Sequence, residues 1–357
     1  MTASHDRVVT NVMTERAPGE FTVPQPGATS RILVTGGAGF IGSHFVRSLF
    51  SGAYPGLTGS RVTVLDKLTY AGNPANLDPV RDRPGFAFVE GDITDAGLVD
   101  SLLADHDAVV HFAAESHVDR SITGAADFVV TNVVGTQTLL DAAHRREIGP
   151  FVHVSTDEVY GSIAEGSWPE TDPLAPNSPY SASKASSDLI ALAYHRTHGL
   201  DVRVTRCSNN YGPYQFPEKV IPLFITNLLD GGKVPLYGDG LNIRDWLHVD
   251  DHCQGIALVL EKGRAGEVYN IGGGTEITNK ELTDRLLSAC GANWDSVNYV
   301  EDRKGHDRRY SVDWRKINAE LGYEPRHDFE SGLAETVAWY RDNRAWWEPL
   351  KQRAGLA

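Results

Sequence analysis

The sequence has few cysteines and lacks a long hydrophobic segment. Its three cysteines, Cys207, Cys253 and Cys290, lie far apart and form no C-x-x-C pair. A sparse, odd set of cysteines favours a reducing compartment and argues against a disulfide framework. No apolar run reaches the ~18 residues that a membrane-spanning helix needs. We therefore expect a cytoplasmic protein without a membrane partner.

Basic residues are also in the minority. The 357-residue chain has 33 Lys and Arg against 47 Asp and Glu, a formal net charge of −14 at pH 7. This balance disfavours nucleic acid as a partner, and an anionic ligand then requires a local group of basic side chains. Residues 1–29 lack the apolar core of a signal peptide and the Arg-rich, acid-poor face of a transit peptide. Their composition predicts a flexible N-terminal extension.

Short apolar runs rich in β-branched residues alternate with helical segments from residue 31 onward. The predicted strands are residues 31–35, 61–65, 86–90, 108–112, 151–155 and 202–206. The predicted helices are residues 40–50, 96–104, 125–146, 181–198, 279–290 and 329–347. Apolar strands that alternate with helices are typical of parallel βαβ units. The pattern predicts an α/β fold with a Rossmann-type doubly wound parallel sheet.

The alternation loosens after residue 206. Residues 209–222 contain three prolines and read as a loop, residues 272–274 are three glycines, and residues 301–310 are charged. We predict a dinucleotide-binding domain at residues 30–206, with a later contribution from residues 236–265. Residues 207–357 would mainly form a smaller, mixed substrate-binding domain.

Three glycines follow the first predicted strand in a G-x-x-G-x-x-G pattern, at Gly36, Gly39 and Gly42. Such glycines permit a tight turn and a close backbone approach, and the next helix then offers its N-terminal amides to a pyrophosphate. A purely structural turn is the alternative. The position on the first strand of a βαβ series favours a dinucleotide. Ser43, in place of lysine, excludes a Walker phosphate loop.

An acidic residue, Asp66, ends the second predicted strand. There a carboxylate can accept hydrogen bonds from ribose hydroxyls and repel a 2′-phosphate, which favours NAD over NADP. Asp66 follows Gly42 by 24 residues, a longer spacing than usual, and the adjacent Lys67 keeps NADP as the alternative. Asp92, beyond the third strand, either contacts the adenine or caps a helix.

A tyrosine and a lysine four residues apart, Tyr180 and Lys184, follow the fifth predicted strand. This spacing puts both side chains on one helical face, at the sheet edge where such folds bind ligands. A phenol has a pKa near 10, and a neighbouring ammonium lowers it. Tyr180 can then accept the proton of a sugar hydroxyl that gives its hydride to NAD. A surface pair is the alternative.

Thr156, Asp157 and Glu158 end the fifth predicted strand. Elimination of water needs an acid for the departing hydroxyl and a base for the adjacent carbon, and two neighbouring carboxyl groups can supply both. Thr156 can hydrogen-bond the hydroxyl that Tyr180 deprotonates. A solvated acidic turn or a helix N-cap is the alternative. The position beside Tyr180 favours the catalytic interpretation.

At these residues the chain resembles the extended short-chain dehydrogenase/reductases, and within them the dTDP-glucose 4,6-dehydratases. The resemblance covers about residues 31–350, and its strongest segments are residues 35–44, 66–73, 111–121, 131–136, 155–161, 180–184, 207–222, 238–251 and 302–310. It implies NAD as cofactor and conversion of dTDP-glucose to dTDP-4-keto-6-deoxyglucose and water. The implied steps are oxidation at carbon 4, elimination across carbons 5 and 6, and hydride return to carbon 6.

The resemblance also implies three sets of site residues. The catalytic set is Thr156, Asp157, Glu158, Tyr180 and Lys184. With the three glycines, the cofactor set is Phe40, Ile41, Asp66, Lys67, Leu68, Thr69, Asp92, Ile93, Phe112, Ala113, Ala114, Ser116, Thr131, Tyr180, Lys184 and Asn210. The substrate set is Ser116, Thr156, Asn209, Lys219, Val220, Pro235, Leu236, Tyr237, Arg244, Asn279, Asp302, Arg303, Lys304, Gly305 and His306. Lys304 departs from the family, where many relatives have proline. The family's homodimer implies contacts through residues 125–146 and 181–198.

Two other functions stay open. A nucleotide-sugar 4-epimerase uses the Tyr/Lys pair and NAD but needs no elimination acid or base, so Asp157 and Glu158 disfavour it. A non-catalytic dinucleotide sensor is disfavoured by the Tyr/Lys pair. The residues do not distinguish a thymine, uracil or cytosine nucleotide, nor the deoxysugar pathway. No metal is predicted: His248 and His252 stand four apart, but Val249 replaces the expected glutamate, which favours a structural or capping role.

Overall fold

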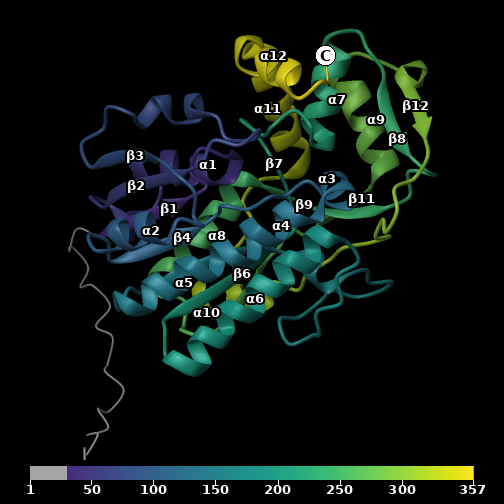
Figure 1. Ribbon diagram of the computed structural model, residues 1–357. Coiled ribbons are helices and arrows are strands. Elements are labelled where there is room, and N and C mark those ends of the chain that lie inside the picture. Colours follow the sequence, from purple (N-terminus) through teal and green to yellow (C-terminus); the bar gives the residue numbers. More distant parts are fainter. Residues whose placement is uncertain (1–29, 357) are drawn as a thin grey trace, which may run out of the picture.

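A seven-stranded parallel sheet forms the larger part of the computed structural model, which describes residues 30–356 (Figure 1). The predicted N-terminal extension lies outside these residues. The strands are β1 (Arg31–Thr35), β2 (Arg61–Asp66), β3 (Phe86–Glu90), β4 (Ala108–His111), β5 (Phe151–Thr156), β6 (Val202–Cys207) and β10 (Val268–Ile271). Their order is β10-β6-β5-β4-β1-β2-β3, the doubly wound arrangement that the alternating pattern predicts. The prediction missed β10, whose four residues stand between two glycine-containing turns.

Helices cover both faces of this sheet. Alternate residues of β1 point to opposite sides: Leu33 packs with residues of α2, α5 and α6, whereas Ile32 and Val34 pack with residues of α1, α8 and α10. The strands therefore contribute two apolar faces, which explains why their sequences are apolar without alternation.

The twelve α-helices of residues 30–356 agree with most of the predicted segments. They are α1 (Phe40–Ser51), α2 (Ala96–Leu103), α3 (Val118–Thr123), α4 (Ala125–Phe128), α5 (Thr136–Arg145), α6 (Pro179–His198), α7 (Val220–Leu229), α8 (Val249–Lys262), α9 (Asn279–Cys290), α10 (Arg315–Leu321), α11 (Phe329–Asp342) and α12 (Arg344–Arg353). The helix predicted for residues 125–146 is confirmed, but its middle is a π-helical segment, η3 (Val129–Gly135), which joins α4 to α5. Over residues 30–356, no helix combines the length and apolar character that crossing a bilayer requires.

The second half of the chain adds two small sheets. A mixed sheet joins β11 (Thr275–Thr278), β9 (Ile243–His248) and β7 (Asn209–Tyr211), and a parallel pair joins β12 (Val297–Val300) to β8 (Val234–Tyr237). With α7 and α9, the parallel pair lies apart from the large sheet, at the upper right of Figure 1. The loop predicted for residues 209–222 is partly wrong, because β7 and the start of α7 fall within it.

Candidate active site

A cleft of about 300 Å³ lies at the carboxyl ends of β1, β4 and β5. Such sheets bind ligands at this edge, where the strand order reverses between β1 and β4. Most of the predicted cofactor set lines the cleft: Gly36, Gly39, Phe40, Ile41, Gly42, Asp66, Lys67, Thr69, Ile93, Phe112, Ala113, Ala114, Ser116, Thr131, Tyr180, Lys184 and Asn210. Leu68 and Asp92 are outside this lining, so their part in cofactor binding stays a prediction.

The glycine loop has no room for side chains at two of its three predicted positions. Gly36 has a φ of +70°, and a Cβ on Gly42 would lie 2.4 Å from the Gly36 carbonyl oxygen. Gly39 is the N-cap of α1, and no described side chain caps this helix. Its first backbone amides therefore remain available to a pyrophosphate. The loop fits a dinucleotide.

Asp66 connects the glycine loop to β2. Its two carboxylate oxygens accept hydrogen bonds from the backbone amides of Ala38 at 2.9 Å and Leu68 at 2.8 Å. A carboxylate has about four lone-pair sites, so it can still accept a ribose hydroxyl in the cleft. The Lys67 ammonium is already paired, because it donates to Thr131 Oγ1 at 3.0 Å and lies 3.6 Å from the Asp92 carboxylate. This pairing weakens the NADP alternative.

Asp92 does not cap a helix. Its carboxylate accepts the backbone amide of Thr94 at 2.9 Å, whereas Asp95 caps α2. The capping alternative is therefore wrong.

Tyr180 and Lys184 are both buried on the first turns of α6, whose start is fixed by a capping box at Ser178. Lys184 donates to the Val154 carbonyl at 2.8 Å, and burial lowers its pKa to about 8. The pKa of Tyr180 is raised well above 10 by burial and by the Glu158 charge, while a hydrogen bond with Thr156 lowers it in part. The pKa of Tyr180 is therefore not lowered overall in the chain alone, and its lowering by Lys184 together with the nicotinamide ring stays a prediction.

Asp157 and Glu158 occupy the short 3-10 turn η4 (Asp157–Tyr160) at the end of β5. Thr156 caps this turn by accepting the Glu158 amide at 3.3 Å, and its hydroxyl donates to Asp157 Oδ1 at 3.2 Å. Asp157 is 2% exposed, and its Oδ2 has no hydrogen-bond partner among the described residues. Thr156, and neither acid, is therefore the N-cap, and the buried Asp157 does not belong to a solvated turn.

The two acids experience different charges. Burial, Glu158 and Asp245 raise the pKa of Asp157 well above its usual value. Burial also raises the pKa of Glu158, but Arg303, Arg244 and Lys219 oppose that rise. The arrangement therefore favours a protonated Asp157 beside an ionised Glu158.

A second cavity of about 220 Å³ adjoins the first and shares Ser116, Glu158, Asn209 and Lys219 with it. The other predicted substrate residues that line it are Val220, Pro235, Tyr237, Arg244, Asn279, Arg303 and His306. Thr156 lines only the first cavity. Three basic side chains thus gather on an acidic protein, as an anionic ligand requires.

The remaining predicted substrate residues line neither cavity. Leu236 is buried in the core, Lys304 and Gly305 are exposed, and Asp302 accepts from His306 Nδ1 at 2.6 Å. Their substrate contacts stay predictions.

The sequence interpretation missed several wall residues, namely His117, Asp119, Gln215, Phe216 and Glu218. Glu218 lines both cavities, and its carboxylate lies 3.4 Å from the Arg120 guanidinium. Its position directly before Lys219 was the available signal, but a lone glutamate in a loop is commonly a surface charge.

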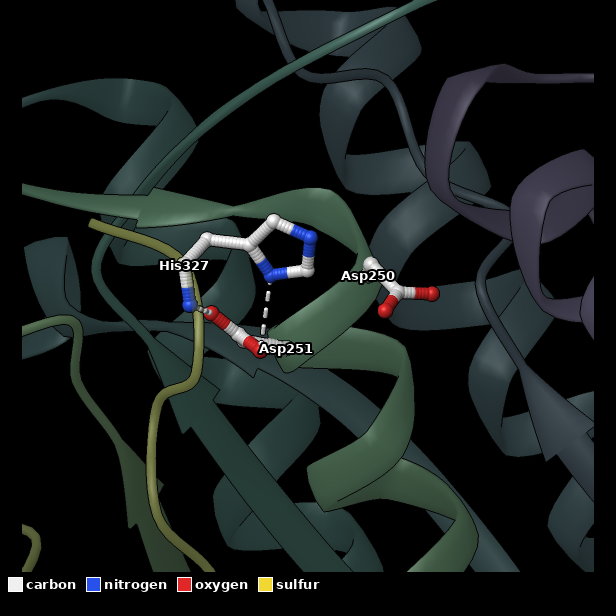
Figure 2. Close-up of side chains that lie close together, drawn as sticks. All are labelled: Asp250, Asp251 and His327. Atoms are coloured by element: carbon white, nitrogen blue, oxygen red, sulfur yellow. Dashed lines mark hydrogen bonds and ion pairs between the residues drawn. The ribbon is translucent and has the colours of Figure 1, made fainter. Parts of the chain in front are cut away.

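His248 and His252 have structural partners, as expected. His248 caps α8 by accepting the Asp250 amide at 3.3 Å, and His252 Nδ1 lies 2.9 Å from Asn210 Oδ1. Beside them, Asp250, Asp251 and His327 bring ligand-type atoms within 4.8 Å of one another (Figure 2). Asp251 accepts the backbone amide of His327 at 3.0 Å, and its other oxygen lies 3.0 Å from the imidazole. These contacts attach residue 327 to α8.

Comparisons with known proteins show the family of this chain. The sequence model of the family described as GDP-mannose 4,6 dehydratase matches residues 33–336. A dTDP-glucose 4,6-dehydratase of Streptomyces antibioticus is 69% identical over 90% of this chain and 96% of its own length. The dTDP-glucose 4,6-dehydratase of Streptomyces venezuelae, solved with NAD bound, is 68% identical with a TM-score of 0.89, over 90% of this chain and all of its own.

Sugar epimerases share the fold at lower identity. The UDP-glucose 4-epimerase of Thermotoga maritima is 34% identical, with a TM-score of 0.81 over 88% of this chain and 99% of its own. The identities separate the two groups clearly. The chain belongs to the GDP-mannose 4,6 dehydratase family, and within it to the dTDP-glucose 4,6-dehydratase branch.

Proposed function

We propose that this chain converts dTDP-glucose to dTDP-4-keto-6-deoxyglucose and water, with NAD as a cofactor that is regenerated in each turnover. The observation that carries the proposal is the different charge environment of Asp157 and Glu158, which an epimerase does not need. The high identity to dehydratases along nearly the whole described chain supports it.

NAD supplies the hydride acceptor at carbon 4 and the hydride donor at carbon 6 when bound. The glycine loop and the amides of α1 would hold its pyrophosphate, and Asp66 its adenosine ribose. Tyr180 accepts the proton of the carbon 4 hydroxyl, and Thr156 orients that hydroxyl. Burial and Glu158 raise the pKa of Tyr180 in the chain alone. The Lys184 charge and the positive nicotinamide ring would together oppose this rise.

The acid pair then removes water. A carbonyl at carbon 4 acidifies the hydrogen on carbon 5, which Glu158 takes as base. Asp157 donates its proton to the carbon 6 hydroxyl, which leaves as water. Hydride return to carbon 6 and a proton at carbon 5 complete the product, so the net change is loss of one water.

The second cavity would hold the nucleoside diphosphate. Lys219 and Arg244 are fixed by backbone contacts: Lys219 donates to the Ser116 carbonyl at 2.8 Å, and Arg244 to the Asp307 carbonyl at 3.0 Å. Fixed cations bind a diphosphate without reorganising. We accordingly propose residues 30–206, completed by the later α8 and β10, as the cofactor domain, with residues 207–357 mainly binding the substrate.

Separate incubation with dTDP-, UDP- and CDP-glucose tests this proposal. We expect the mass to fall by one water with the dTDP sugar. An unchanged mass with a changed sugar configuration would establish an epimerase instead.

We further propose a homodimer through η3 and α6. Val130 on η3 and Leu189 on α6 are 50% and 55% exposed, and their elements pack against each other within the chain. Val129 and Val134 extend this exposed apolar surface, which is unusual for a free helix face. The wild type should have the mass of two chains in light scattering, and Leu189→Asp the mass of one. An equal mass for both would place the interface elsewhere.

The cytoplasmic location stays a prediction from the cysteine content.

A further inference from the structure

A buried aspartate follows the Tyr/Lys pair on the same helix. Tyr180, Lys184 and Asp188 stand at intervals of four residues on α6, which puts them on successive turns of one face. The Asp188 side chain is 0% exposed. A carboxylate in such a position needs compensating partners, because burial without them is strongly unfavourable.

Asp188 has two partners on neighbouring strands. Its Oδ2 accepts from Arg206 Nε of β6 at 2.8 Å, and its Oδ1 lies 3.2 Å from His153 Nε2 of β5. Burial opposes the charge of Asp188, but Arg206 and His153 outweigh it and hold its pKa at about 2. Burial lowers the pKa of His153 to about 4, so this imidazole is neutral. Asp188 is therefore ionised at every pH at which the enzyme would work.

Lys184 must carry a positive charge beside Tyr180 although it is buried. It is only 4% exposed, and burial lowers its pKa to about 8. The charge that opposes this lowering is that of Asp188, because burial raises the pKa of Cys207 and keeps it a neutral thiol. The other titratable groups that interact with Lys184 or line the cleft with it are His111, His153, Cys207, Tyr180, Asp157 and Glu158, and Arg206 lies beyond them as the partner of Asp188. The π segment η3 contributes none.

We propose that Asp188 is a positioning residue that keeps the buried Lys184 charged, so that Tyr180 can act as the base in oxidation at carbon 4. This inference rests on the proposed function and acts through Lys184, since Asp188 itself contacts Arg206 and His153. Arg206 also donates to the Tyr160 hydroxyl at 2.7 Å at the end of η4. The same ion pair therefore connects α6 to the turn that carries Asp157 and Glu158.

The test compares three variants by the pH dependence of single-turnover NADH formation. Asp188→Asn keeps the shape and removes the charge. Asp188→Asn/Arg206→Gln removes both charges, so it leaves no isolated buried cation if the single variant folds poorly. Tyr160→Phe is the matched control, because it breaks the same network beyond Arg206 without changing a charge.

Asp188→Asn should move the basic limb of oxidation about one pH unit lower, the order expected of one close charge. Above that limb its rate should fall roughly tenfold relative to the wild type. Asp188→Asn/Arg206→Gln should move the limb in the same direction but less far, because loss of the Arg206 cation raises the pKa of Lys184 in part. Tyr160→Phe should leave the limb in place. A uniform fall at all pH values in the Asp188 variants, or an equal shift in Tyr160→Phe, would overturn the proposal. Oxidation without water loss in the wild type would contradict the proposed dehydration and leave this test intact.

A second readout needs no turnover. It follows the tyrosinate absorbance of NAD-loaded enzyme as the pH is raised. The part of this absorbance that is missing in Tyr180→Phe reports ionisation of the Tyr180 phenol. Removal of the Asp188 charge should move that signal to higher pH, because the phenolate loses part of its neighbouring positive charge. An unchanged signal would show that Asp188 does not act on the pair.

Discussion

At the scale of the residue, the nearby charges give two neighbouring acids different roles. The charges of Glu158 and Asp245 raise the pKa of Asp157 against the effect of Arg244, whereas Arg303, Arg244 and Lys219 oppose the rise at Glu158. The sequence predicts the pair, because its position after the fifth strand is visible in the chain. It cannot predict which acid keeps its proton, since the three cations come from residues 219, 244 and 303.

Substitutions should separate the steps that these residues perform. Tyr180→Phe should abolish oxidation, because it removes the phenol oxygen that accepts the hydroxyl proton. The Asp157→Asn variant should oxidise the substrate normally. It should eliminate water about 10²–10⁴-fold more slowly, which is the usual effect of removing a general acid. Rapid mixing that follows NADH absorbance and product mass distinguishes the two. Equal defects in NADH formation would contradict the separate roles.

The pH dependence of water loss should also depend on Asp157. Its raised pKa keeps it protonated beyond the usual range of a carboxyl group, and the acid is lost as the pH rises through that value. The rate of water loss from preformed 4-keto sugar should therefore fall on the basic side. Asp157→Asn should remove this limb, because an amide does not titrate. A limb that persists in the variant would assign it to another group.

At the scale of the element, the sequence predicts the helices and strands that form because of local residue patterns. Six strands of the large sheet and helices α1, α2, α6 and α9 lie within two residues of their predicted bounds. The prediction missed β7 and β10, which have three and four residues and form only because β9 and β6 lie beside them. The prediction also missed the π-helical hydrogen bonding of η3, because the valines of this segment are equally compatible with an ordinary α-helix.

The glycine loop provides a test at this scale. A methyl group at Gly42 would meet the Gly36 carbonyl at 2.4 Å, so Gly42→Ala must displace the loop. Such overpacking typically costs about 1–3 kcal/mol, and we expect NAD affinity to fall at least about tenfold. Gly97→Ala is the matched control, because its added methyl group meets only Asp95 Oδ1, at an ordinary 3.5 Å. NAD titration by fluorescence measures both. Equal affinities would show that the loop does not hold the cofactor.

At the scale of the whole molecule, an acidic protein concentrates fixed cations in one cavity. The formal charge of −14 predicts the need for such a cavity but not its place. Lys219 is the N-cap residue of α7, Arg244 lies on β9, and Arg303 lies in the segment after β12, so the cavity exists only after these elements meet. The resemblance to a family identified these positions, whereas charge patterning alone would leave each as a surface residue.

The most direct test of the account follows hydrogen through one turnover. The carbon 5 hydrogen becomes acidic only after carbon 4 is oxidised, so oxidation must precede the action of Glu158. Substrate deuterated at carbon 4 should deliver its label to carbon 6 of the same molecule, and turnover in deuterium oxide should place one deuterium at carbon 5. Glu158→Gln should still form bound NADH but incorporate almost no solvent label. Return of the label to carbon 4 with inverted configuration would contradict the account and identify an epimerase.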